Sequence, residues 1–141
     1  MRRTVLSLIF IAAIASMIYS CQGADQLKQD IYYTNGRDIY IKNCQNCHGV
    51  NGEGLGALTP GLTDSIFLKE NKQKIACIIK YGMDSTITIN GQQFEDKMPD
   101  FNTLANIDLA QLIVYVTNSF GNKQGMYTPE QVAADLKKCS N

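Results

Sequence analysis

The sequence predicts an all-α domain that also contains one short β-hairpin. Three segments place apolar residues at the spacing of an amphipathic helix, and one segment alternates apolar residues on either side of an Asn-Gly pair. Hydrophobic residues make up 45% of the 141 residues, which is enough for one modest core. The formal net charge is zero and no basic patch favours nucleic acid, so we expect a single domain with no nucleic-acid partner.

The first twenty residues are typical of an export signal. A basic start at residues 2–3 precedes an almost entirely apolar run, Val5–Ile18, and Cys21 directly follows Ser20. The run has 14 residues, whereas a membrane-spanning helix needs about 20. The position of Cys21 resembles the lipobox of bacterial lipoproteins, in which the signal is cleaved before a cysteine that is then lipidated. Tyr19 departs from the usual residues of that box.

The chain is therefore divided into a signal peptide at residues 1–20, a polar lipidated tether at 21–33 and a domain at 34–141. The alternatives to lipidation are an ordinary secretory signal or an uncleaved anchor, and both also place the domain outside the cytoplasm. Without the signal, 11 basic residues face 13 acidic ones, a net charge of −2. We expect the protein on the periplasmic side, held to the inner or outer membrane by the lipid on Cys21.

The helices of the domain are expected at residues 35–44, 69–81, 106–120 and 129–138. Thr34 or Asn35 is a suitable cap for the first helix, and Gly82 and Gly121 follow the second and third. Thr128 precedes a proline and stands three residues before a glutamine, which is a capping box for the last helix.

The remaining segments are a loop and a hairpin. Residues 49–63 hold five glycines and one proline, so they are expected to form a loop. In the stretch ITINGQQF, Ile87 and Ile89 alternate before Asn90-Gly91, and Phe94 follows. Asn and Gly tolerate the positive φ angles of a type I′ turn, so a two-residue hairpin is predicted here.

The stretch Cys44–His48 reads CQNCH, and its histidine is the only one in the chain. A tetrahedral zinc site needs about four ligands, adjacent residues rarely converge on one ion, and no second CxxC follows. A thioredoxin-like pair follows a strand, whereas this pair follows a predicted helix. The third possibility is haem attachment, in which two thiols add across the two vinyl groups and the neighbouring imidazole binds iron. The export signal favours haem, because this attachment takes place outside the cytoplasm.

A second iron ligand is then expected downstream. Three methionines follow the signal, namely Met83, Met98 and Met126. Met98 lies between the predicted hairpin and the third helix, and Pro99 stiffens the backbone beside it. A loop methionine next to proline is well placed as a ligand, so Met98 is preferred and Met83 is the second choice.

These features together resemble a mono-haem class I cytochrome c. CQNCHG is similar to the attachment motif of that family, TPGL to its proline loop, MPDF to its axial methionine loop and LAQLIVYVTNSFGN to its C-terminal helix. The hairpin resembles a subgroup that serves as cytochrome subunits or fused haem domains of alcohol dehydrogenases, nitrite reductases and terminal oxidases. The resemblance covers residues 34–135 and implies the cytochrome c fold, in which helices surround one covalent haem c.

The resemblance also implies roles for particular residues. Gly36 and Tyr40 match contact positions of the N-terminal helix, and Leu112 and Tyr115 match the facing positions of the C-terminal helix. The carbonyl of Pro60 is implied to accept a hydrogen bond from the iron-binding His48, which would fix the tautomer of the imidazole. Glu95 and Asp96 beside the methionine, and the extra Cys77 and Cys139, depart from common versions of the family.

The two spare cysteines leave two readings open. In an oxidising compartment Cys77 and Cys139 tend to form a disulfide, whose role would be structural. Alternatively, Cys77 is a buried thiol among isoleucines and Cys139 is a free thiol in the tail.

The leading functional hypothesis is an electron carrier, not an enzyme, that moves single electrons between membrane-associated enzymes of a respiratory chain. His48 and Met98 would hold the iron, and Cys44 and Cys47 the porphyrin, with redox proteins as partners. One alternative is a haem enzyme or ligand sensor, such as a peroxidase, with a displaceable sixth ligand. The other is a dedicated haem subunit of one oxidoreductase complex.

Overall fold

A computed structural model of the chain describes residues 2–63 and 65–139, without the side chains of residues 2, 7, 8, 12, 15–22 and 65. The chain forms two units, residues 1–31 and 32–141. The side chain of Cys21, the predicted lipidation site, therefore lies outside the described part.

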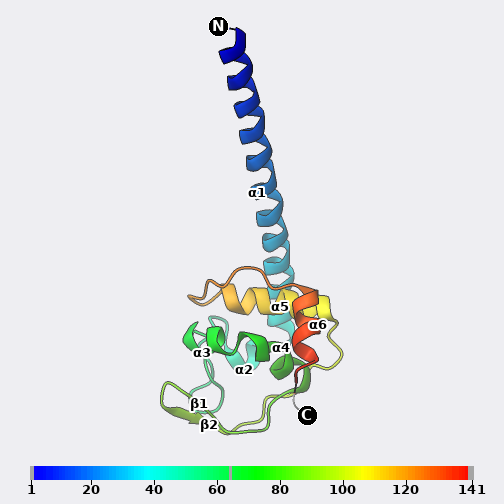
Figure 1. The fold of residues 1–141 in the computed structure, drawn as a ribbon. Coiled ribbons are helices and arrows are strands. Elements are labelled where there is room, and N and C mark those ends of the chain that lie inside the picture. The colour runs from blue at the N-terminus through cyan, green and yellow to red at the C-terminus, as the bar shows by residue number, and fades with distance from the viewer. Residues whose placement is uncertain (1, 64, 140–141) are drawn as a thin grey trace. The chain divides into compact units, whose positions relative to one another are not determined.

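Helix α1 comprises Arg2–Asn43 and includes the whole predicted tether (Figure 1). The expectation that a helix starts at Thr34 or Asn35 is wrong. No proline interrupts residues 22–33, and Ala, Gln, Leu and Lys there all favour helix. In the first unit, Gln26 donates a hydrogen bond to Asp30, one turn later, over 2.8 Å. Among the residues that the structure describes, there is no helix with the length and apolarity that a membrane span requires.

In its described residues the second unit contains five further helices, which confirms the all-α prediction. They are α2 (Gln45–His48), α3 (Ser65–Glu70), α4 (Lys72–Tyr81), α5 (Asn106–Asn118) and α6 (Pro129–Leu136). The helix expected at 69–81 is interrupted at Asn71, whose side-chain amide donates to the carbonyl of Phe67 over 3.0 Å. The helix α5 ends two residues earlier than expected, because Phe120 and Gly121 both have positive φ angles, 57° and 93°.

The predicted hairpin is confirmed as strands β1 (Ile87–Ile89) and β2 (Gln92–Phe94). The strands pair antiparallel, with Ile87 opposite Phe94 and Ile89 opposite Gln92. Both turn residues have positive φ, 52° at Asn90 and 79° at Gly91, as a type I′ turn requires.

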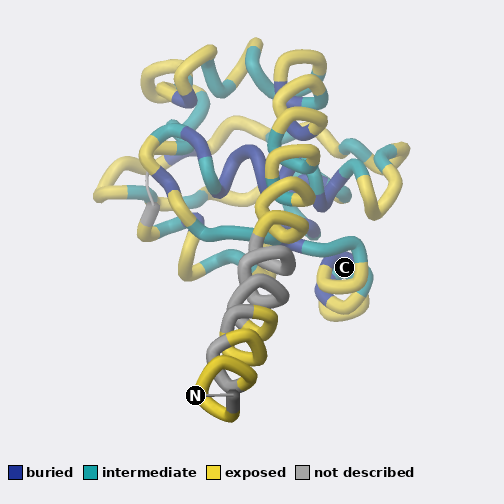
Figure 2. The backbone as a smooth tube through the Cα atoms, turned by 90° about the horizontal axis from the view of Figure 1, so that it is seen from above, coloured by how far each residue is buried: buried dark blue, intermediate teal, exposed yellow. Residues whose placement is uncertain are grey.

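The core of the second unit is centred on α5, where buried residues are concentrated (Figure 2). Helices α4, α5 and α6 pack against one another (Figure 1). The part of α1 within this unit crosses α5 at Gly36, where an added Cβ would lie 2.0 Å from the carbonyl oxygen of Gln111. The ring of Tyr40 lies 5.2 Å from that of Tyr115 and 5.4 Å from that of Phe120. The crossing depends on a residue without a side chain.

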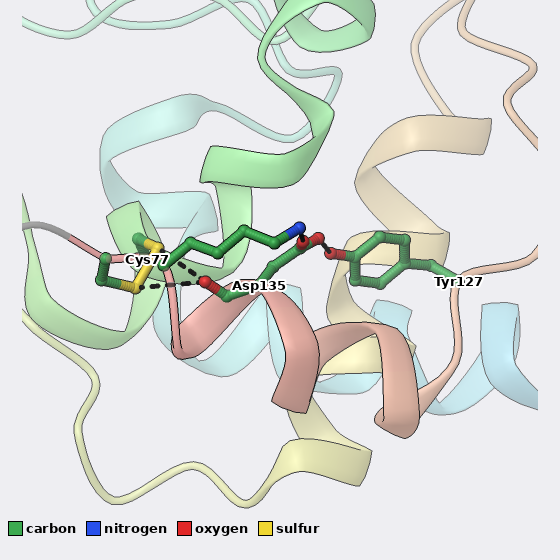
Figure 3. The surroundings of a disulfide bond; sticks show 5 residues. Cys77, Tyr127 and Asp135 are labelled. Atoms are coloured by element: carbon green, nitrogen blue, oxygen red, sulfur yellow. Dashed lines mark hydrogen bonds and ion pairs between the residues drawn. A yellow bond between two sulfur atoms is a disulfide. The ribbon is translucent and has the colours of Figure 1, made fainter.

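A disulfide joins Cys77 of α4 to Cys139, just after α6 (Figure 3). Both sulfur atoms lie near the carbonyl oxygen of Asp135, at 3.7 and 3.8 Å. The carboxylate of Asp135 accepts a hydrogen bond from the hydroxyl of Tyr127 and pairs with Lys138 at 3.0 Å. The last helix is therefore fixed both covalently and through a buried carboxylate.

Candidate functional site

The CQNCH segment forms a single helical turn at the end of α1. The backbone N–H of His48 donates to the carbonyl of Cys44 over 2.9 Å, and that of Cys47 donates to the same oxygen over 3.1 Å. Both cysteines are free thiols, with Cys44 half-buried and Cys47 exposed. Burial raises the pKa of the Cys44 thiol to about 12, so this sulfur carries its proton at neutral pH. The turn brings the two thiols and the imidazole to one side.

The three side chains border a cavity with two lobes. Six residues line both lobes, and these are Cys44, His48, Pro60, Met83, Ile87 and Met98. The outer lobe also touches exposed side chains, among them Cys47, Leu58 and Asp96. The inner lobe is lined by the apolar core, including Leu68, Ile75 and Leu112. The cavity thus joins a water-facing edge at Cys47 to a dry interior.

His48 is held in one orientation by the proline loop. Its Nδ1 lies 3.0 Å from the carbonyl oxygen of Pro60. A carbonyl can only accept, so Nδ1 carries the proton and the lone pair remains on Nε2. Burial lowers the pKa of His48, while the Pro60 hydrogen bond acts in the opposite direction. The neutral imidazole with a free Nε2 is the form that binds a metal ion.

Hydrogen bonds hold the proline loop in place. Tyr40 donates its hydroxyl to the carbonyl of Gly49 over 2.6 Å, and the N–H of Gly54 donates to the carbonyl of His48 over 2.8 Å. Further along, the side-chain amide of Asn122 donates to the carbonyl of Leu62 over 2.8 Å. Sequence reasoning did not single out Asn122, although it lies in the stretch NSFGN that resembles the family.

The methionine loop is tied to the end of α4. The N–H of Phe101 donates to the carbonyl of Ile79 over 3.0 Å, and Lys80 donates to the carbonyls of Asn102 and Leu104 over 2.5 and 2.7 Å. On the surface, Lys97 pairs with Asp84 at 2.9 Å, which raises the pKa of Lys97. Met98 is therefore presented by a backbone with little freedom.

Some of the other residues predicted from the sequence line the cavity, and some do not. Asp96 borders the outer lobe, whereas Glu95 is exposed and does not line either lobe. Met126 packs against the core and lines neither lobe. Met83, the second choice from the sequence, lines both lobes together with Met98.

The donor set fits a covalently bound haem. Two free thiols one helical turn apart match two vinyl groups, a neutral imidazole and thioethers are iron ligands, and an apolar lining suits a porphyrin face. The helical fold and this site together define a c-type cytochrome.

Comparison with known proteins gives the family. A family model described as cytochrome c oxidase, cbb3-type, subunit III matches residues 33–116, and the chain belongs to this family. One cytochrome c-552 of Thermus thermophilus is 22% identical, and the match covers 98% of this chain and 97% of that protein. Another cytochrome c-552 of the same species is 25% identical, and the match covers 74% of this chain and 95% of that protein. The cofactor is accordingly haem c, and the function is haem-based electron transfer with redox-partner proteins.

Proposed function

We propose that the protein is a one-electron carrier whose iron is held by His48 and Met98. The observation that carries this proposal is the cavity itself, because His48 and Met98 line the same two lobes that Cys44 borders. The hydrogen bond between His48 and Pro60 supports His48 as the first ligand. The fixed methionine loop supports Met98 as the second.

Each residue has a separate chemical task. The thiols of Cys44 and Cys47 would hold the haem, each by adding its S–H across one vinyl double bond, which would give two thioether links with no net oxidation. Haem c supplies an iron that gains or loses one electron. A thioether ligand stabilises ferrous iron, so Met98 raises the reduction potential relative to two imidazoles. With His48 and Met98 both bound to the iron, oxygen and peroxide would have no open site, and the apolar lining of the inner lobe would exclude water.

The attachment is tested first with the double variant Cys44→Ala/Cys47→Ala. We expect the exported wild-type protein to keep its haem on a denaturing gel and the double variant to lose it. Covalent haem in the double variant would contradict the assigned attachment.

The axial ligands are tested by optical spectra in both oxidation states, with and without carbon monoxide. Ferric wild type should show the weak far-red band of sulfur-bound iron, and ferrous wild type should not bind carbon monoxide rapidly. Met83→Leu should leave both properties unchanged, whereas Met83→Leu/Met98→Leu should lose the band and bind carbon monoxide. A wild type that already lacks the band and binds carbon monoxide at once would instead be a haem enzyme or ligand sensor.

The family description favours a second candidate for the biological setting. A family named after an oxidase subunit suggests that this chain serves one oxidoreductase complex as its dedicated haem subunit. Purification from its native membrane in mild detergent tests this candidate. Recovery in a fixed ratio with a larger enzyme would support it, whereas recovery alone would favour a carrier that moves between enzymes.

We further propose that residues 1–20 direct export and that a lipid on Cys21 holds the protein to the periplasmic side of a membrane. The basic start, the apolar run and the cysteine after Ser20 support this. Cys21→Ser should release the haem protein from the membrane fraction and abolish incorporation of labelled palmitate. Gln22→Ala is the control and should stay bound. Retention of label by Cys21→Ser would contradict the lipid assignment.

A further inference from the structure

Met83 and Met98 lie side by side across an antiparallel β-bridge. The N–H of Met83 donates to the carbonyl of Met98 over 3.0 Å, and the N–H of Met98 donates back to the carbonyl of Met83 over 2.9 Å. Two residues that exchange both backbone hydrogen bonds are directly opposed, and their side chains project from the same face of the pair. Both methionines accordingly line both lobes of the haem cavity.

The bridge is held together by a close backbone approach. Gly82 has a φ of +73°, and a Cβ there would lie 2.6 Å from the carbonyl oxygen of Met98. Only glycine meets both conditions, so the segment that carries Met83 stays against the segment that carries Met98. The backbone N–H of Phe101 also donates to the carbonyl of Ile79, so a further hydrogen bond joins the same two segments.

The two side chains also offer the same chemistry. Each ends in a thioether on three rotatable bonds, so either sulfur can move by a rotamer change while the backbone stays fixed. Both side chains are half-buried, which leaves them room at the edge of the cavity. Met126, by contrast, lines neither lobe and has no such access.

We infer that Met83 is a second thioether ligand for the same iron and takes the axial position whenever Met98 leaves it. This inference rests on the proposed ligation by His48 and Met98. When Met98 leaves, the sulfur of Met83 replaces it on the iron. A site with a single methionine would instead be left open to a diatomic ligand. Met83 would thereby protect the ferrous iron from oxygen and carbon monoxide during movements of the methionine loop.

The test compares Met98→Leu with Met83→Leu/Met98→Leu in the holoprotein. Leucine keeps the apolar volume but removes the sulfur, so both variants are expected to fold. Ferric Met98→Leu should keep a far-red sulfur-to-iron band at a shifted wavelength, and the double variant should lose it. Suppose that Met83 is bound to the iron in about nine-tenths of the ferrous Met98→Leu molecules. The apparent affinity of this variant for carbon monoxide should then be about tenfold below that of the double variant.

Two control variants separate the possible results. Met126→Leu should keep the wild-type band, and Met126→Leu/Met98→Leu should behave as Met98→Leu does, because Met126 lines neither lobe. The inference is overturned if Met98→Leu matches Met83→Leu/Met98→Leu in band and carbon monoxide affinity, a result that leaves Met98 as the wild-type ligand. If Met83→Leu alone loses the band, the proposed ligation by Met98 fails as well, so the two failures are distinguishable.

Discussion

Asn122 shows how one buried amide positions a loop that carries no ligand itself. Its side chain is 1% exposed and donates to the carbonyls of Leu62 and Ser119 over 2.8 and 3.0 Å. Leu62 lines the inner lobe two residues after Pro60, and the N–H of Leu62 donates to the carbonyl of Gly52 over 2.7 Å. Asn122 therefore connects the end of α5 to the loop that orients His48.

Asn122→Ala should destabilise the protein by about 1–3 kcal/mol, because the Leu62 carbonyl is left without its donor. Guanidinium unfolding of the holoprotein measures this loss. The neighbouring exposed residue Lys123 gives the control, and Lys123→Ala should change the free energy of unfolding by less than about 0.5 kcal/mol. Equal effects of the two substitutions would show that the amide does not hold the loop.

At this scale, part of the site could be predicted and part could not. The proposed attachment residues Cys44, Cys47 and His48 lie within five residues of sequence. Haem attachment requires them within one helical turn, so a local sequence motif is enough to find them. Met98 was preferred because Pro99 follows it, and the structure does bring it to the same cavity. The position of Met83 opposite Met98 could not be predicted from the sequence, because it depends on a backbone bridge to a residue in another segment.

At the scale of the elements, α1 and α5 approach each other closely at Gly36. An added Cβ at Gly36 would lie 2.0 Å from the carbonyl oxygen of Gln111 and 2.9 Å from the Cβ of Tyr115. No rotamer relieves a clash with backbone, so any side chain at Gly36 separates the two helices. Such a separation would also move Tyr40, whose hydroxyl donates a hydrogen bond to the carbonyl of Gly49 directly after the CQNCH turn.

Gly36→Ala should therefore destabilise the protein by about 3 kcal/mol or more, the upper part of the range for overpacked cores. Thermal unfolding followed at the haem absorbance gives the measurement. Gly23→Ala is the matched change in the same helix, where an added Cβ meets nothing within 4 Å. It should be neutral or stabilising by up to about 1 kcal/mol. Similar losses in both variants would argue against the crossing.

Lys80 gives a second prediction at this scale, because it joins the last turn of α4 to the methionine loop. Its ammonium group is the donor to the carbonyls of Asn102 and Leu104. Lys80→Met should cost about 1–2 kcal/mol and shift loss of the far-red band to lower guanidinium concentration. Lys74→Met, at an exposed position of the same helix, is the control and should not move that midpoint.

The boundaries of the elements show where local sequence reading stops. The hairpin could be predicted in full, because Asn90 and Gly91 both tolerate the positive φ angles of a type I′ turn. The break at Asn71 was missed, because an asparagine inside an apolar pattern gives no sign that its side chain will bond to the carbonyl of Phe67. The end of α5 was misplaced by two residues, because a positive φ at Phe120 is supported by its aromatic contacts with Tyr40 and Tyr115.

For the whole molecule, the bond between Cys77 and Cys139 closes a loop with a sequence separation of 62 residues. The loop contains Met83, Met98, the hairpin, α5 and α6, whereas the CQNCH turn lies outside it. Closing such a loop removes conformations from the unfolded chain and leaves the folded chain unchanged.

Cys77→Ser/Cys139→Ser should lower the free energy of unfolding by about 4 kcal/mol according to the loop length. The far-red band and the reduction potential should not change in the folded protein, because neither cysteine lines the haem cavity. Guanidinium titration and a redox titration of the same samples give both answers. A large change in potential would mean that the disulfide acts on the site as well as on stability.

The contacts that fix α6 also limit how often this helix opens. A short helix ordinarily opens readily when nothing fixes its ends, so its amide protons exchange rapidly with solvent. Here the disulfide, the Tyr127–Asp135 hydrogen bond and the capping box of Thr128 hold both ends of α6. In deuterium oxide its amides should therefore exchange on the timescale of global unfolding, so that α6 belongs to the slowest-opening part of the domain.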